Sequence, residues 1–232
     1  GIFAQRYDAS GLPVDSEFKV NATTHKHQTD PAAAMADDGS FVVVWVSEDQ
    51  DGDKTGIFGQ RYDANGDRLG AEFQVNTRTQ HEQRAPDVAM DAAGRFVVVW
   101  ESKDQDGDDY GIFGQVFDNT GARVGDEFRA NFETYKDQQA ASVAMDVDGD
   151  FVVAWQSEVP GIDKWDIRAR RFNPDGTAKD AADGEGTLHH QHGPGIVDRQ
   201  DLHDAIHAED RRRLRPRRHL IHELRLWRAL TK

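Results

Sequence analysis

A motif that recurs without slipping constrains the fold of this chain more than any other feature. The letters GIF open at Gly1, Gly56 and Gly111, 55 residues apart, and a weaker copy begins at Asp166. Other residues share this spacing, namely Phe18, Phe73 and Phe128; Met35, Met90 and Met145; Phe41, Phe96 and Phe151; and Trp45, Trp100 and Trp155. A fixed period of this size indicates a repeat architecture, in which each unit buries its apolar face against its neighbours.

Short segments with strand character, separated by turn residues, fill each unit. Residues 86–90 (PDVAM) are small and apolar, and residues 95–100 (RFVVVW) are apolar on both alternating faces. Residues 56–63 (GIFGQRYD) and 71–76 (AEFQVN) alternate between apolar and polar side chains. These patterns predict four β-strands per unit. No stretch of residues 1–180 carries a convincing helical period.

Four antiparallel strands in about 50 residues are typical of a propeller blade. We therefore expect an all-β fold, a β-propeller-like array of four-stranded antiparallel blades. The blades should span about residues 28–77, 83–132 and 138–180 of a domain at 1–180, with residues 1–21 supplying the outer two strands of a preceding blade. Because four to eight blades normally close a ring, three and a fraction form an open arc, and the chain is expected to be a fragment. A β-solenoid, whose coils usually have shorter periods, is the competing architecture.

Charge and composition exclude several classes of partner. The formal net charge is −14, and residues 1–180 hold 34 Asp and Glu against 18 Lys and Arg. An acidic body of this kind argues against nucleic acid and anionic membranes, because phosphate binding needs basic surface. The absence of cysteine excludes disulfides and Cys-ligated zinc. No apolar run approaches the roughly 18 residues of a membrane helix, so no membrane insertion is expected.

Two acidic loops are the candidate metal sites. The sequence DQDGD occurs twice and places carboxylates at alternate positions, namely Asp49, Asp51 and Asp53, and Asp104, Asp106 and Asp108. Calcium takes six to eight oxygen ligands, and carboxylates at alternate positions of a Gly-containing loop can converge on one ion. The other interpretation is a solvated hairpin turn, since turns favour Asp and Gly. Gln60 and Gln115 stand where an EF-hand loop would have its glutamate.

Glutamines and tryptophans that recur once per unit favour a structural role. Buried polar groups must be hydrogen-bonded, so amides at one phase of every blade are expected to satisfy backbone groups between blades; these are Gln5, Gln60 and Gln115, and Gln28, Gln83 and Gln138. The tryptophans are expected to pack between blades, and a sugar-stacking platform is the alternative.

No catalytic motif stands out in the repeats. The patterns GxSxG and HExxH and the P-loop are absent, and so is the SxDxGxTW box of sialidase-type propellers. Carboxylates are numerous enough that two could meet at the separation that glycoside chemistry needs. Catalysis rarely repeats once per blade, so we expect no enzyme.

Residues 181–232 differ in character from the repeats. They hold 8 acidic and 10 basic residues and seven of the ten histidines. The segment is expected to be irregular or weakly helical. It reads as a basic amphipathic helix, with a metal suggested by HHQH, or as the next blade translated out of frame, because a one-base shift permits Asp-Gly-Asp-Phe, the sequence of residues 148–151. We leave it out of the functional argument.

The phrases GIFGQRYDANG, EFQVN and FVVVW followed by DQDGD resemble a repeat of large secreted bacterial proteins of the RTX or haemolysin-type calcium-binding class. The resemblance covers residues 1–176, although the nonapeptide GGxGxD of that class is absent. It implies an extracellular or cell-surface location, while calcium as the cofactor is expected from the two acidic loops.

Three functions remain open from the sequence. The preferred one is a non-enzymatic extracellular scaffold module, calcium-binding and adhesive, with a glycan, a surface protein and the remaining blades of a parent chain as partners. The alternative is a carbohydrate-active or sialidase-like propeller with its site in the axial funnel. The third is a spacer without a ligand.

Overall fold

The computed structural model describes residues 1–159 and 165–179, and every regular element in these ranges is a β-strand. No helix among these residues has the length and apolar character to cross a membrane. The strands are β1 (Phe3–Tyr7), β2 (Pro13–Lys19), β3 (Gln28–Met35), β4 (Phe41–Glu48), β5 (Thr55–Tyr62), β6 (Arg68–Gln74), β7 (Gln83–Met90), β8 (Phe96–Lys103), β9 (Tyr110–Phe117), β10 (Arg123–Arg129), β11 (Gln138–Met145), β12 (Phe151–Glu158) and β13 (Trp165–Phe172).

The strands form antiparallel sheets that follow chain order. β3 to β6 make the first four-stranded sheet and β7 to β10 the second, while β11 to β13 form a three-stranded sheet and β1 pairs with β2. The expected all-β, propeller-like array of four-stranded antiparallel blades is confirmed, and the sheets do not have the parallel coils of a β-solenoid. A fourth strand for the third blade, and the segment from residue 181, lie outside the described residues.

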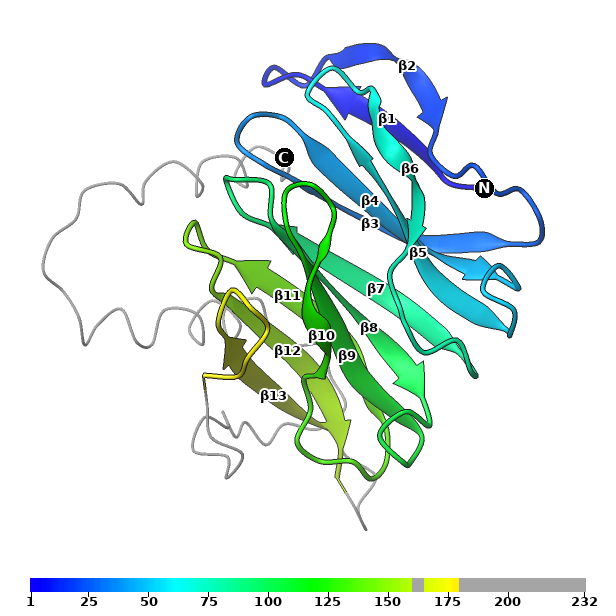
Figure 1. Ribbon diagram of the computed structural model, residues 1–232, viewed down its shortest axis with the longest axis vertical. Coiled ribbons are helices and arrows are strands. Elements are labelled where there is room, and N and C mark those ends of the chain that lie inside the picture. Colours follow the sequence, from blue (N-terminus) through cyan, green and yellow to red (C-terminus); the bar gives the residue numbers. More distant parts are fainter. Residues whose placement is uncertain (160–164, 180–232) are drawn as a thin grey trace, which may run out of the picture. The chain divides into compact units, whose positions relative to one another are not determined.

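The first strand of each of the three larger sheets lies beside the first strand of its neighbour. β7 contacts β3 on one side and β11 on the other, so these three inner strands converge (Figure 1). In Figure 1 the sheets succeed one another in chain order, from the blue β1–β2 pair to the yellow β13. The inner strands are therefore the place where residues from different blades can share one site.

Each hydrophobic cluster lies between two neighbouring sheets. Val42 and Val44 of β4 face the next blade and join a cluster with Phe96 and Trp100 of β8. The opposite face of β8, with Val97 and Val99, joins a cluster with residues of β12 and β13. A strand that is apolar on both faces is thus covered on both sides by blades, as the sequence pattern predicts.

A stacked aromatic pair joins the second and third strands of every blade. The ring centroids lie 4.7 Å apart for Phe41 and Tyr62, 4.8 Å for Phe96 and Phe117, and 5.0 Å for Phe151 and Phe172. The tryptophans on the same strands are buried between blades, with exposures of 0% for Trp45, 0% for Trp100 and 2% for Trp155. Their predicted packing role is confirmed, and such burial leaves no indole face for a sugar.

The recurring glutamines satisfy backbone carbonyls, as expected of buried amides, but these carbonyls lie within one blade or its connecting segment and not between blades as predicted. Gln60 donates through Nε2 to the carbonyl oxygens of Arg61 at 3.0 Å and Gly70 at 3.2 Å, across a register shift between β5 and β6. Gln83 accepts from Nδ2 of Asn76 at 3.1 Å, which ties the start of β7 to the end of the preceding blade.

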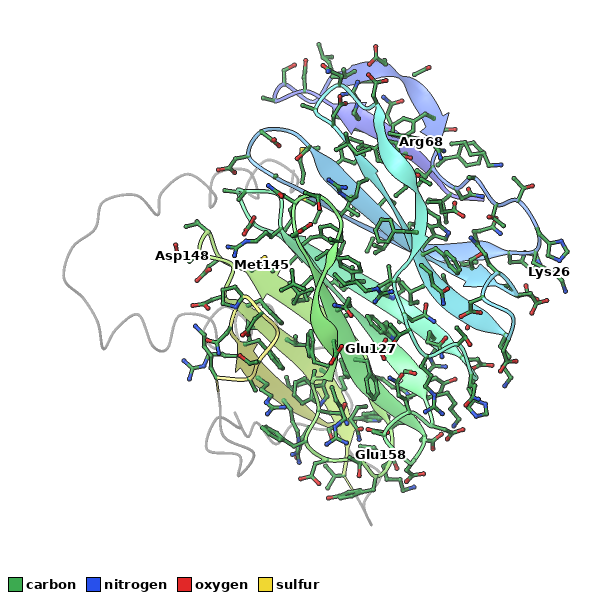
Figure 2. All side chains as sticks on the ribbon, in the orientation of Figure 1. Lys26, Arg68, Glu127, Met145, Asp148 and Glu158 are labelled. Carbon is green, nitrogen blue, oxygen red and sulfur yellow. The ribbon has the colours of Figure 1, made fainter. Side chains whose placement is uncertain are left out.

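Charged side chains of the outer strands reach the preceding sheet. Arg68 of β6 donates to the carbonyl oxygen of Val20 at 2.7 Å, and Arg123 of β10 donates to that of Gln74 at 3.0 Å. Glu127 accepts from the backbone nitrogen of Thr77 at 2.8 Å. Figure 2 labels Arg68 and Glu127 on these two blades. The frame is therefore built from contacts that repeat from blade to blade.

Candidate functional site

Each inner strand carries a β-bulge at the same repeat position. The register shifts between Thr29 and Ala32, between Arg84 and Asp87, and between Gln139 and Ser142. The bulged residue has a positive φ in all three, 50° at Asp30, 48° at Ala85 and 53° at Ala140. Bulges leave a residue without a ladder partner and are frequent next to active sites, where they redirect side chains. The inner strands thus share a feature that suits a binding site.

The second blade places an ion pair beside its bulge where the other blades have none. Arg84 of β7 donates from Nε to Oε2 of Glu101 of β8 at 2.7 Å, and the Glu101 side chain is only 5% exposed. The positions 55 residues away, which we call counterparts, are Thr29 and Val46 in the first blade. The position that holds Val46 in the first blade and Gln156 in the third is therefore occupied by a buried carboxylate in the second.

Two contacts offset the cost of burying this carboxylate. Removing an ion from water costs several kcal/mol even after relaxation, unless a partner and hydrogen bonds compensate. Arg84 supplies one contact, and the backbone nitrogen of Ala140, the bulged residue of β11, donates to Oε1 of Glu101 at 2.7 Å. Glu101 therefore joins the second blade to the inner strand of the third.

A second carboxylate lies at the same junction. Asp87 of β7 accepts through Oδ2 from the backbone nitrogen of Val143 at 2.9 Å and from the hydroxyl of Ser142 at 3.2 Å. Its counterparts are Ala32 and Ser142. Asp87 and Glu101 thus both bind the short stretch 140–143 of β11.

A third carboxylate, that of Asp30, lies exposed at the bulge of β3, the strand on the other side of β7. Its counterparts are Ala85 and Ala140. Acidic side chains therefore lie on three neighbouring strands, β3, β7 and β8, each at a position where the repeat has small, hydroxyl, amide or apolar residues.

Tyr110, the first residue of β9, extends the cluster. Its hydroxyl donates to Oε2 of Glu82 at 2.5 Å, and the guanidinium carbon of Arg84 lies 3.6 Å from its ring centroid. Burial, followed by the hydrogen bond to Glu82, raises the pKa of Tyr110 to about 12. The same hydrogen bond is the main reason that the pKa of Glu82 is lowered, with Lys54 3.6 Å away as a further cause. Tyr110 therefore stays protonated and helps to fix Arg84.

This cluster was not predicted from the sequence, because its residues do not recur from unit to unit. The available signal is the reverse: Arg84, Asp87, Glu101 and Tyr110 change residue type at positions where the frame is otherwise copied. Chemically, the cluster offers carboxylate acceptors and a guanidinium donor, groups that bind hydroxyl-rich ligands. Paired carboxylates are also the groups that hydrolyse glycosidic bonds.

The acidic loops lie between the second and third strands of the first two blades, as predicted, but their carboxylates point to different partners. Asp49 forms an ion pair with Lys26 at 3.3 Å. Asp51 accepts from Nδ2 of Asn76 at 3.1 Å, and Asp53 accepts from the backbone nitrogen of His81 at 2.8 Å.

The second loop repeats most of this arrangement. Asp106 accepts from Nδ2 of Asn131 at 2.7 Å, and Asp108 accepts from the backbone nitrogen of Lys136 at 3.0 Å. Asp104 adopts a positive φ of 55°, as Asp49 does at 59°. Two of the three carboxylates in each loop therefore bind the segment that leads into the next blade.

The central carboxylates are partly buried, and desolvation is the main reason that the pKa values of Asp51 and Asp106 are raised. Four oxygen acceptors of these loops are buried without a hydrogen-bond donor, namely Oε1 of Gln50, Oδ1 of Asp51, Oε1 of Gln105 and Oδ1 of Asp106. Over residues 1–159 and 165–179, no group of three or more His, Cys, Asp or Glu side chains is placed to hold a metal ion. Calcium binding by these loops stays a prediction.

A cleft of about 350 Å³ lies elsewhere, at the turns that join the strands of the first two blades. Arg61, Asp63, Met90 and Asn119 are among the residues that line it. None of Asp30, Asp87 and Glu101 contributes to its wall. The cleft and the acidic cluster are therefore separate features.

No family model and no curated protein matches this sequence. Several solved structures resemble the fold of this chain. An endo-arabinase from Bacteroides thetaiotaomicron is 16% identical with a TM-score of 0.43, over 76% of this chain and 64% of that one. A thermostable family-43 glycoside hydrolase is 14% identical with a TM-score of 0.44, over 83% and 73%. An endo-1,5-alpha-L-arabinanase from Thermotoga petrophila is 16% identical with a TM-score of 0.42, over 81% and 46%. The likeness is one of fold, and the chain spans less than two thirds of the first of these enzymes.

These comparisons correct two expectations. The non-enzymatic scaffold module and the expectation of no enzyme are contradicted by these comparisons, in which three solved structures of similar fold are described as an endo-arabinase, a family-43 glycoside hydrolase and an endo-1,5-alpha-L-arabinanase. They are consistent with a glycan partner. The resemblance to RTX proteins and the extracellular or cell-surface location stay predictions, since none of these structures bears on them.

Proposed function

We propose that the chain is part of a carbohydrate-active propeller with an acidic site on the inner side of its second blade. One observation carries the proposal: Asp30, Asp87 and Glu101 each occur once, on or behind the inner strands, at positions where the other units carry Ala, Ser, Val or Gln. Structural contacts recur from blade to blade in this chain, and these carboxylates do not.

The burial of the three carboxylates suggests how their work is divided. Asp30 is exposed and Asp87 is partly exposed, and they lie on the adjacent inner strands β3 and β7. Glycoside hydrolysis needs a carboxylic acid that protonates the leaving oxygen and a carboxylate that acts as base or nucleophile. We assign these reacting roles to Asp30 and Asp87. Glu101 is buried and acts as a positioning residue that holds β11 through Ala140.

A substrate screen tests this proposal. The chain is incubated with chromogenic glycosides and a panel of polysaccharides that includes arabinan, and new reducing ends are measured. We expect hydrolysis of at least one member, and a loss of about a hundredfold or more in the variants Asp30→Asn and Asp87→Asn. Asp126→Asn, an exposed carboxylate of the outer strand β10, is the matched control and should keep full activity.

Two results would overturn the assignment. One is the absence of hydrolysis across the panel, which contradicts the enzyme itself. The other is equal activity of the Asp87→Asn variant and the unmodified chain, which contradicts the site. Circular dichroism and thermal melting of each variant separate lost chemistry from lost folding.

Calcium binding by the acidic loops is a second candidate function, because one specific observation favours it. The unpartnered oxygens of Gln50 and Asp51 recur in Gln105 and Asp106, so each loop has two buried acceptors that a cation could satisfy. Calcium prefers such neutral and anionic oxygens together. A ligand that binds only the folded state raises Tm.

Thermal melting in millimolar calcium, in magnesium and in a chelator tests this second candidate. We expect a higher Tm in calcium, and the paired substitution of Asp51 and Asp106 by Asn should remove the difference. An unchanged Tm at millimolar calcium would reject binding.

A further inference from the structure

The cleft of about 350 Å³ lies at the junction of the first and second blades, each of which has all four of its strands in the described chain. Turns at the same end of both blades form its wall. The β3–β4 turn contributes Asp38 and Ser40, the β5–β6 turn Asp63, the β7–β8 turn Gly94 and the β9–β10 turn Asn119. The cleft therefore lies inside the repeat array and does not result from an uncovered blade.

A difference of one residue between the blades accompanies this cleft. At the junction of the second and third blades, Arg95 donates through Nη2 to the carbonyl oxygen of Asp148 at 2.8 Å, and this nitrogen lies 2.5 Å from the place where a Cβ atom on Gly149 would stand. The first blade has Ser40 at the position of Arg95, and its Oγ lies 3.9 Å from the equivalent place on Gly94. A guanidinium thus spans one junction, whereas a short hydroxyl side chain leaves the other open.

Apolar side chains form the inner part of the wall. The stacked rings of Phe41 and Tyr62 are 6% and 1% exposed, and Met90 and Leu69 also line the cleft. Small-molecule sites combine such apolar lining with a few polar groups, and they enclose about 300 to 1,000 Å³. The cleft is at the lower end of this range, which limits its ligand to one or two rings.

Polar groups of the wall are mainly hydrogen-bond acceptors. The pKa of Asp38 is lowered, chiefly by a hydrogen bond from the side chain of Ser40, and the pKa of Asp63 is lowered, chiefly by a hydrogen bond from the backbone of Asp67. Both carboxylates are therefore ionised at neutral pH and can accept hydrogen bonds from hydroxyl groups. The exposed side-chain amide of Asn119 can donate as well as accept.

The charges of the wall favour an uncharged ligand. Arg61 is the one cation among the described lining residues, and its guanidinium already donates to the carbonyl oxygens of Asn119 and Thr120. The carboxylates of Asp38 and Asp63 disfavour an anion. Each of them also accepts from a backbone nitrogen of its own turn, which weakens its attraction for a cation.

We infer that this cleft binds a sugar residue of a neutral glycan chain and holds the chain without cleaving it. The hydroxyl groups of a sugar match the acceptors and the amide of the wall, and its C–H faces match the apolar side chains. The site is distinct from the acidic cluster, because Asp87 binds β11 of the third blade, whereas Met90 packs in the cluster between the first and second blades. The inference goes beyond the proposed function and does not depend on its reacting carboxylates.

Amide NMR spectra of the full chain test this inference. The chain carries Asp30→Asn and Asp87→Asn, so that no sugar is hydrolysed, and it is titrated with neutral arabino-, xylo- and gluco-oligosaccharides. We expect at least one of them to shift the signals of Asn65, Gly94 and Asn119, which line the cleft. The dissociation constant should be about 1 mM, the weak affinity of a ligand of one or two rings.

One substitution closes the cleft in the way that the second blade does. Ser40→Arg should weaken binding at least about tenfold, because a guanidinium then occupies the space of the sugar. Ser10→Arg, which adds the same charge at the exposed β1–β2 turn, is the matched control and should bind like the parent. Thermal melting checks the fold, and Asn119→Ala, with a loss of binding also expected, replaces Ser40→Arg if that variant unfolds.

Three results would overturn the inference. They are the absence of shifts at the cleft with every neutral oligosaccharide, equal binding by the Ser40→Arg variant and the parent, and shifts with uronic acid or amino sugar oligomers alone. Failure of the proposed function looks different. A chain that hydrolyses no polysaccharide but binds sugar at the cleft contradicts the enzyme alone, whereas a chain that hydrolyses the panel without binding at the cleft contradicts this inference alone.

Discussion

The first and second blades share one frame and differ in what the frame holds. The same aromatic stack joins their middle strands, at 4.7 Å in the first and 4.8 Å in the second. At one buried position on the second strand, however, the first blade has Val46 and the second has Glu101. Because the strands pair in the same register in both blades, the comparison separates the residues that a blade needs for stability from those that it has in addition.

The largest expected effect tests the shared frame. Phe41→Ala and Phe96→Ala each remove one ring of a buried stack, and each should lower the free energy of unfolding by about 4 kcal/mol. Urea unfolding measures both. Losses that differ by more than about 2 kcal/mol would break the comparison, because the two blades would then not be equivalent supports.

The next effect concerns the ion pair that only the second blade has. Arg84→Met leaves the carboxylate of Glu101 buried without its cation, and removing one partner of a buried pair costs about 3 kcal/mol. We take the low end of the usual range because the Arg84 side chain is 38% exposed. The control is Thr29→Met at the exposed counterpart in the first blade, which should change the free energy of unfolding by less than about 0.5 kcal/mol.

A double substitution sharpens the same comparison. Arg84→Thr with Glu101→Val gives the second blade the residues of the first, and apolar replacement of a buried ion pair is often neutral or stabilising. We expect a free energy of unfolding within about 1 kcal/mol of the unmodified chain. If the double variant is as unstable as Arg84→Met, the ion pair is part of the frame and not an addition to it.

A smaller effect is expected at Tyr110, whose counterpart is Thr55. Tyr110→Phe keeps the ring under Arg84 and removes the hydrogen bond to Glu82, with a loss of about 1 kcal/mol. The raised pKa of Tyr110 adds stability that is complete below the ordinary tyrosine pKa and is lost as the pH rises toward about 12. Urea unfolding at neutral and strongly alkaline pH should show this loss in the unmodified chain and not in the variant. Tyr7→Phe, at an exposed position, is the control.

The smallest effect tests a feature that the two blades share. The pKa values of Asp51 and Asp106 are raised, so the stability they contribute is complete below the ordinary carboxyl pKa and is lost as the pH rises through the raised value. Substituting either by Asn should therefore raise Tm slightly at neutral pH in a chelator. Asp53→Ala should instead lower Tm, because it removes the oxygen that accepts a hydrogen bond from the backbone nitrogen of His81. A fall in Tm for Asp51→Asn would contradict the burial argument.

The repeat made the frame predictable from the sequence. A doubly apolar strand such as residues 96–100 has to be covered on both faces, and this requirement already implies sheets that pack face to face. The amides of Gln60 and Gln83 were predictable for a similar reason, because a buried amide at a fixed phase needs backbone partners. The same pattern recurs in each 55-residue unit, so the strands expected in one unit are supported by those expected in the others.

The acidic cluster was not predictable in the same way. The pairing of Glu101 with Arg84 depends on the register of β7 against β8, and its bond to Ala140 depends on a bulge in the next blade. Neither is visible along the chain. The loop carboxylates show the reverse error, since alternate spacing suggested convergence, whereas Asp53 and Asp108 each bind a separate backbone nitrogen of the following segment.

Within residues 1–159 and 165–179, each hydrophobic cluster draws its side chains from two neighbouring sheets. A gene that gains or loses one whole unit therefore leaves the remaining contacts intact, since every junction has the same form. Duplication of this kind supplies spare copies of a working scaffold, and a spare copy can accept an otherwise harmful charge. One blade can thus acquire new functional residues while the other blades of the same chain preserve the fold.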